Sequence, residues 1–142
     1  MNLVIDNPDN LDLDIFCEVL IKSMQNYLAS EIDEDQLIRF DAFLNNNNII
    51  NYVDKSNRLL STKAILIGSS YNLIVVKNKT NYTIELDPNV NIPNTYAKFI
   101  DMVKLINYGN LGLPAYPIYD NMMNYFADNI EDYFKIYLEE IE

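Results

Sequence analysis

The sequence has no histidine, no tryptophan, one cysteine and two arginines among its 142 residues. Without histidine the chain lacks the commonest general base and metal ligand, which excludes Ser–His and Cys–His catalytic pairs and zinc sites of Cys and His. Cys17 is the single cysteine, so no internal disulfide can form, as is typical of a reducing compartment. We therefore expect a non-enzymatic, cytoplasmic protein that needs no cofactor and no metal.

Carboxylates are the remaining side chains with catalytic or magnesium-binding chemistry. The closest local pairs are Asp33 with Asp35, which suits a helix start, and Glu131 with Asp132, which suits a solvated helix face. The acidic run at 6–18 lacks the central glycine of a calcium loop, and the run Gly-Asn-Leu-Gly at 109–112 lacks the lysine of a phosphate loop. The sequence predicts no catalytic residue and no metal ligand.

Long apolar runs are also missing. No stretch approaches the roughly 20 residues of a membrane-spanning helix. The first residues, MNLVIDNPDNLDLD, contain no basic region and are interrupted by carboxylates, so we expect no secretory signal and no membrane partner.

Positive charge is scarce, and the net charge is −11. It is −8 over residues 1–42, +3 over 43–100 and −6 over 101–142. A chain this acidic repels phosphate, so we expect no direct nucleic-acid binding. The charge has two interpretations: it keeps an apolar, Asn-rich chain in solution, or it forms a surface for a basic partner, for which the candidates are Glu34, Asp35, Glu139 and Glu140.

The abundant residues are 21 Asn, 18 Ile and 11 Tyr, against three Gly. Asn, Ile and Tyr have AT-rich codons, so this composition is typical of an AT-rich genome. A phage or another virus is a candidate source, in which case the location becomes the host cytoplasm or the virion.

Length and hydrophobic content predict one domain over residues 1–142 with a sizeable core. We expect an α+β fold in which four helices flank a small antiparallel meander of two or three strands. Helical spacing of apolar residues predicts helices at 12–30, 33–45, 96–108 and from Asp120 to the C-terminus. Short β-branched runs at 63–68, 71–77 and 81–86 are interpreted as the strands.

Two helix features are predicted in more detail. Asp33 and Gln36 have the spacing of a capping box, and Ile32 and Leu37 have the spacing of a hydrophobic staple. Cys17 is expected inside the first helix as a small buried apolar residue.

The stretch from Ile106 to Asn121 holds two of the three glycines and two of the five prolines. Gly109 is expected to end a helix, and Pro114 and Pro117 prevent the helix from continuing. The connection is longer and more apolar than two helices need. It either covers the core or contacts a partner, and the candidate interface residues are Leu111, Leu113, Tyr116, Ile118 and Tyr119.

From these patterns we expect an interaction or structural subunit of a larger protein assembly, with a phage or viral particle among the candidates. Its partner would be another protein or copies of the chain itself. The alternative is an acidic inhibitor that mimics nucleic-acid phosphate and blocks a basic site on a partner protein.

Overall fold

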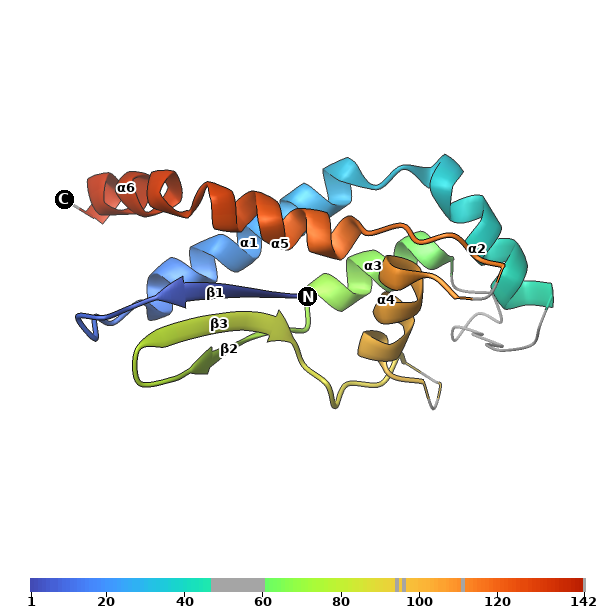
Figure 1. Ribbon diagram of the computed structural model, residues 1–142, viewed down its shortest axis with the longest axis horizontal. Coiled ribbons are helices and arrows are strands. Elements are labelled where there is room, and N and C mark those ends of the chain that lie inside the picture. Colours follow the sequence, from blue (N-terminus) through green and yellow to red (C-terminus); the bar gives the residue numbers. More distant parts are fainter. Residues whose placement is uncertain (47–60, 94, 96, 111, 142) are drawn as a thin grey trace.

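The computed structural model describes residues 1–46, 61–93, 95, 97–110 and 112–141, and Figure 1 shows their arrangement. The described residues form six helices and one three-stranded antiparallel sheet, which confirms the predicted α+β class. In chain order the elements are β1 (Asn2–Asp6), α1 (Asp14–Glu31), α2 (Glu34–Asn46), α3 (Thr62–Ser70), β2 (Leu73–Lys77), β3 (Asn81–Leu86), α4 (Phe99–Tyr108), α5 (Ile118–Asp128) and α6 (Ile130–Ile141).

The sheet has the strand order β1-β3-β2, with β3 in the centre and both pairings antiparallel. Side chains alternate between the two faces of a strand, and the register aligns Leu3 and Val75 on either side of Ile84. Helices α1 and α5 lie along one side of this sheet (Figure 1). One face of the sheet therefore packs on the helices.

The main core lies between the sheet and these two helices. It joins buried residues of the strands, α1 and α5 in one cluster, including Leu3, Ile5, Ile84, Leu86, Phe16, Leu20, Met24, Leu28, Tyr119, Met122 and Phe126. A second, smaller cluster joins Ile65 of α3 to Ile92, Phe99 and Met102. Burial of apolar surface on this scale is the dominant favourable term in folding.

Two of the sequence-based strand and helix predictions are wrong. Residues 63–68 belong to α3, whose N-cap is Ser61: its Oγ accepts a hydrogen bond from the Ala64 backbone nitrogen at 3.1 Å. The third strand is instead β1, which pairs with β3 from Asn2 to Asp6. The expected four helices are six, because α3 was interpreted as a strand and the last helix divides in two.

The division of the last helix falls at Asn129, between α5 and α6. The Asn129 side chain donates from Nδ2 to the Tyr125 carbonyl at 2.8 Å, and its backbone nitrogen bonds the same oxygen at 3.2 Å. An asparagine that competes for backbone acceptors in this way favours a helix end. The helix also starts at Ile118 rather than at Asp120, whose backbone nitrogen donates to Asn107 Oδ1 at 3.0 Å.

Several other predictions are confirmed. Cys17 is buried on α1, and Gly109 is the C-cap of α4 with φ of 74°. The capping box predicted from Asp33 and Gln36 is formed only in part: Asp33 Oδ1 accepts a hydrogen bond from the Asp35 backbone nitrogen at 3.0 Å, and the Gln36 backbone nitrogen bonds the Asp33 carbonyl at 3.0 Å. Ile15 of α1 is 61% exposed, so the apolar residues of this helix do not all face the core.

Candidate docking groove

A groove of about 570 Å³ lies at the end of the molecule where α6 projects. One wall is the C-terminal half of β1 with the turn that follows it, and the other is α6 with the last turn of α5. We call this the end groove. Its lining residues are Val4, Ile5, Asp6, Asn7, Pro8, Asp9, Leu11, Leu13, Phe16, Ala127, Ile130, Glu131, Phe134, Lys135 and Leu138.

The turn after β1 is held by the buried side chain of Asn7. Its Nδ2 donates to the Leu11 carbonyl at 2.8 Å, and its Oδ1 accepts the Leu11 backbone nitrogen at 3.0 Å. The Asn7 carbonyl also accepts the Asn10 backbone nitrogen at 3.1 Å, and Asn10 has φ of 50°, a conformation that asparagine tolerates. These bonds fix Leu11 at the rim, so this wall is formed before anything binds.

The opposite wall is positioned by aromatic packing. The ring of Phe134 on α6 lies edge-on to the ring of Phe16 on α1, with centroids 5.1 Å apart. Tyr137 packs against Phe16 as well, with centroids 5.4 Å apart. Edge-to-face aromatic pairs are worth about 0.5–1.5 kcal/mol beyond their buried area. These rings hold α6 across the groove from β1.

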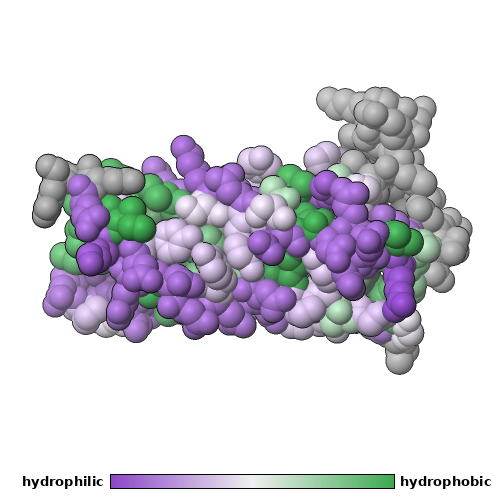
Figure 2. All heavy atoms as spheres, turned by 90° about the horizontal axis from the view of Figure 1, so that it is seen from above, coloured by the Kyte–Doolittle hydropathy of each residue, from purple (hydrophilic) through white to green (hydrophobic). Residues whose placement is uncertain are grey.

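The groove is apolar inside and acidic at its rim. Val4 is 50% exposed, Leu11 51% and Leu138 40%, although all three are large aliphatic side chains. Figure 2 shows hydrophobic patches beside hydrophilic side chains at the α6 end of the molecule. Among the lining residues the carboxylates Asp6, Asp9 and Glu131 oppose the single ammonium of Lys135. A ligand that is both apolar and cationic therefore fits this surface.

The predicted interface residues of the 109–119 stretch lie elsewhere. Leu113, Ile118 and Tyr119 are 6%, 4% and 0% exposed and belong to the main core, so their side chains are not free to meet a partner. Their assignment to an interface is corrected: the stretch covers the core, which was the other interpretation of the sequence. Leu111 lies outside the described residues.

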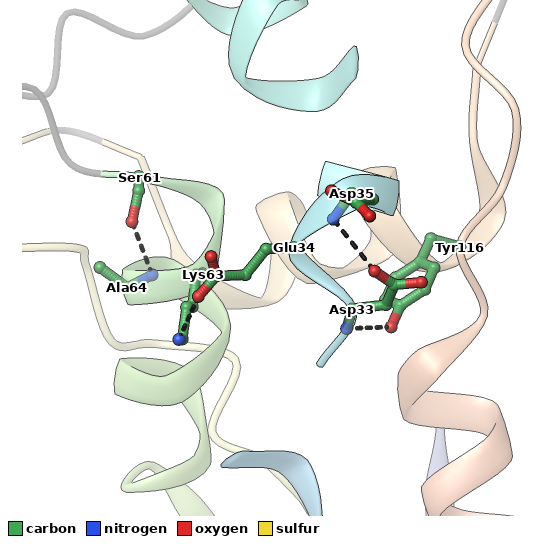
Figure 3. A network of polar contacts seen from close by, with 7 residues as sticks. All are labelled: Asp33, Glu34, Asp35, Ser61, Lys63, Ala64 and Tyr116. Atoms are coloured by element: carbon green, nitrogen blue, oxygen red, sulfur yellow. Dashed lines mark hydrogen bonds and ion pairs between the residues drawn. The ribbon is translucent and has the colours of Figure 1, made fainter. Parts of the chain in front are cut away.

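Tyr116 is half-buried, and its hydroxyl reaches the turn between α1 and α2 (Figure 3). It accepts the Asp33 backbone nitrogen at 3.0 Å and lies 3.4 Å from the Glu31 carbonyl. Tyr116 also lines a smaller, more polar hollow of about 240 Å³ together with Asp35, Gln36, Arg39, Phe40, Pro114 and Ala115. The backbone of Tyr116 bonds the Ile106 carbonyl at 2.8 Å. This residue thus links the loop to three helices.

The four candidate residues of an acidic partner surface do not form one surface. Glu34 and Asp35 lie at the start of α2, whereas Glu139 lies on α6 at the opposite end of the long axis (Figure 1). Glu34 is paired with Lys63, whose ammonium lowers the pKa of the Glu34 carboxyl by hydrogen bonding and charge (Figure 3). The side chain of Glu140 lies outside the described part of the chain.

Sequence reasoning missed the end groove. Val4 and Leu11 lie outside every predicted element, and Leu138 lies within the helix predicted from Asp120 to the C-terminus. The available signal for the strand was the short, partly β-branched apolar run Leu3, Val4 and Ile5 between polar residues, a composition that favours strands. No signal in the sequence places α6 across from that strand.

Within the described residues, no group of three or more Cys, Asp or Glu side chains is placed to hold a metal ion. The helices found there are also too short or too polar to cross a membrane. Comparison with protein-family models, with curated protein sequences and with solved structures found no match. The function is therefore argued from the groove itself.

Proposed function

We propose that this chain is a non-enzymatic interaction subunit of a larger protein assembly, and that its end groove binds an apolar, basic segment of another protein. The observation that supports this proposal is the incomplete cover of α6. Its Phe134, Tyr133 and Tyr137 are only partly buried against the core, and Leu138 and Ile136 are exposed. A helix packed as a finished surface element would bury its apolar stripe.

Covering the groove is energetically worthwhile. Val4, Leu11 and Leu138 each leave about half of a large aliphatic side chain in water. At ~25 cal/mol per Å² of apolar surface, covering each exposed half is worth about 1 kcal/mol. Partner side chains that cover them would bury apolar surface on both walls of the groove. This is the arrangement of an interface centre, where apolar anchors are surrounded by polar groups.

The charge of the rim selects the kind of partner. Asp6, Asp9 and Glu131 attract lysine or arginine on the partner. A second copy of this chain carries the same net charge of −11 and the same acidic rim, so electrostatic repulsion disfavours self-association through this surface. Of the two partners expected from the sequence, the groove therefore favours a different protein over another copy.

The groove fits more than one kind of assembly. A phage or viral particle remains one proposed setting, and it is supported by the abundance of Asn, Ile and Tyr, which have AT-rich codons. The proposed inhibitor that mimics nucleic acid needs carboxylates spread along one surface. The distance between α2 and α6 gives that alternative less support than the groove gives to a docked apolar segment.

A pair of synthetic peptides tests the proposal: an alternating Lys-Val peptide of about seven residues and its Glu-Val counterpart. Binding is measured by calorimetry at low and at roughly physiological salt, because simple charge attraction is screened over about 8 Å at 0.15 M. We expect the Lys-Val peptide to bind at both salt concentrations and the Glu-Val peptide not to bind.

Two substitutions on the same helix localise the binding. Leu138→Ser changes a groove residue, whereas Ile136→Ser changes an exposed residue of α6 that does not line the groove. We expect Leu138→Ser to weaken binding about tenfold, as loss of one ~1.4 kcal/mol contact does, and Ile136→Ser to leave it unchanged. Equal effects of the two substitutions, or no binding of the Lys-Val peptide at physiological salt, would contradict the proposal.

A further inference from the structure

The strand that forms one wall of the end groove is an edge strand of the sheet in the described residues. Within the described chain β1 pairs with β3 on one side only, because β1 is the outer strand in the order β1-β3-β2. The groove is lined on this side by four consecutive residues, Val4 to Asn7, so the strand runs along its wall. Figure 1 shows that β3 lies on one side of β1 and that α1, α5 and α6 lie on the other.

The alternation of hydrogen-bonded positions along β1 shows which of its backbone groups point away from β3. The Asn7 backbone nitrogen donates to the Thr80 carbonyl at 2.7 Å, in register with the pairing of Asp6 with Asn81. In an antiparallel pair, hydrogen-bonded and non-bonded positions alternate. Leu3 and Ile5 lie four and two residues before Asn7, so their backbone groups also bond β3. The N–H and C=O groups of Val4 and Asp6 therefore point away from β3.

The pairing of β3 with β2 agrees with this alternation. The Asn78 backbone nitrogen donates to the Asn81 carbonyl at 2.9 Å, and the Asp87 backbone nitrogen donates to the Asn72 carbonyl at 2.9 Å. Odd-numbered residues of β3 therefore bond β2, and even-numbered residues bond β1. The backbone groups of Thr83, the partner of Val4, bond β2, so the N–H and C=O groups of Val4 point away from β3.

We propose that the partner segment binds in an extended conformation, as a fourth strand added to the free edge of β1 between that strand and α6. This inference rests on the proposed function and names the binding mode of the same site. The added strand bonds the N–H and C=O groups of Val4 and Asp6. Alternate side chains of the segment contact Phe134 and Leu138, and the intervening basic side chains reach Asp6, Asp9 and Glu131 at the rim.

The geometry favours a strand over a helix. Four residues of β1 span about 13 Å at ~3.3 Å per residue, which offers one short ladder of hydrogen bonds. A helix already satisfies its own backbone and would leave the groups of Val4 and Asp6 unpaired beneath it. An added strand pairs these groups and still places alternate side chains against α6, as in other cases of strand addition.

Amide hydrogen exchange, read by NMR with the Lys-Val peptide as the probe, tests this mode. In the free protein we expect the Ile5 amide to be protected by β3 and the Val4 and Asp6 amides to exchange rapidly. With saturating peptide we expect the exchange of the Val4 and Asp6 amides to slow at least tenfold. Binding that leaves both amides exchanging at their free rates would overturn the strand mode while leaving the proposed function intact.

A second probe uses the unmodified protein, so that folding is not at issue. Two Lys-Val peptides carry N-methyl groups on alternate residues, either at the lysines or at the valines, so that the methyl groups block opposite edges of the extended chain. We expect one of them to bind at least tenfold more weakly than the other. Equal affinities would overturn the added strand, whereas failure of the unmethylated peptide to bind would instead overturn the proposed function.

Discussion

The hydroxyl of Tyr116 accepts a hydrogen bond from the Asp33 backbone nitrogen, with the two atoms 3.0 Å apart (Figure 3). In a capping box this nitrogen is bonded by the side chain three residues further on, which here is Gln36. Here the hydroxyl of a tyrosine 83 positions further along the chain takes the place of the Gln36 side chain. The start of α2 depends on the 109–117 loop.

Replacing Tyr116 by Phe removes this bond and keeps the ring. We expect a loss of about 0.5–1.5 kcal/mol in the free energy of unfolding, the usual net worth of one hydrogen bond. The Asp33 amide should also exchange faster, since it loses its acceptor. Tyr108→Phe is the matched control, because Tyr108 is 55% exposed and its hydroxyl forms no such bond with the residues that the structure describes. Equal urea midpoints for the two variants would contradict the linking role of Tyr116.

The two loop glycines provide a second test with an internal control. Gly109 and Gly112 both have φ of 74°, but a Cβ on Gly109 would lie 2.6 Å from the Leu113 carbonyl oxygen, whereas a Cβ on Gly112 meets nothing within 4 Å. Gly112→Ala should cost about 1 kcal/mol from backbone strain alone. Gly109→Ala should cost clearly more, because the collision adds to the strain. Thermal unfolding measures the stability of both variants. Equal losses of stability would show that the loop backbone shifts to relieve the collision at Gly109 without further cost.

The sequence predicted helices well where an amphipathic stripe and a start signal coincided. At α2 the acidic first turn, Asp33 and the buried Leu37 all agree with the structure. The sequence-based prediction of a strand at 63–68 was wrong because the run Lys-Ala-Ile-Leu-Ile-Gly of α3 is apolar on several sides of a short helix. Periodicity cannot separate such a helix from a buried strand. The overlooked signal was Ser61, whose hydroxyl caps the helix.

The site was less predictable than the fold because it depends on tertiary contacts. The loop at 109–119 was interpreted as an interface on account of its apolar side chains, yet Tyr119 is 0% exposed and is hydrogen-bonded to Ser69 of α3. A sequence shows that a loop is apolar but not which surface it covers. The end groove has the opposite origin: Val4 and Leu138 are far apart in the chain and line one groove only after folding.

Leu113→Ala tests whether this loop stabilises the core. Leu113 is 6% exposed within the main cluster, so truncation should lower the free energy of unfolding by about 2–5 kcal/mol, the cost of emptying a buried leucine site. Ile38→Ala, at a position on α2 that is 61% exposed, should change it by no more than ~0.5 kcal/mol. Sedimentation at several concentrations checks association. Unchanged stability with altered association would restore the interface interpretation of Leu113.

Cys17 should be almost unreactive in the folded protein. Its side chain is 0% exposed, and burial, with a smaller effect of Asp14, raises the pKa of the thiol from 9.0 to about 11. We expect a thiol reagent at neutral pH to label it roughly 10²-fold or more slowly than in the urea-unfolded chain, because labelling must wait for local opening.

The raised pKa of Cys17 also predicts a pH dependence of stability. Below about pH 9 both the folded and the unfolded thiol hold the proton, so the contribution is fully present. Between about pH 9 and 11 the unfolded thiol ionises first, and stability falls. Cys17→Ala is the control, because every other ionisable group is present in both proteins. Urea unfolding from pH 8 to 11 should therefore show a steeper decline for the native sequence than for Cys17→Ala. Parallel curves, or labelling as fast as in urea, would place the thiol outside the core.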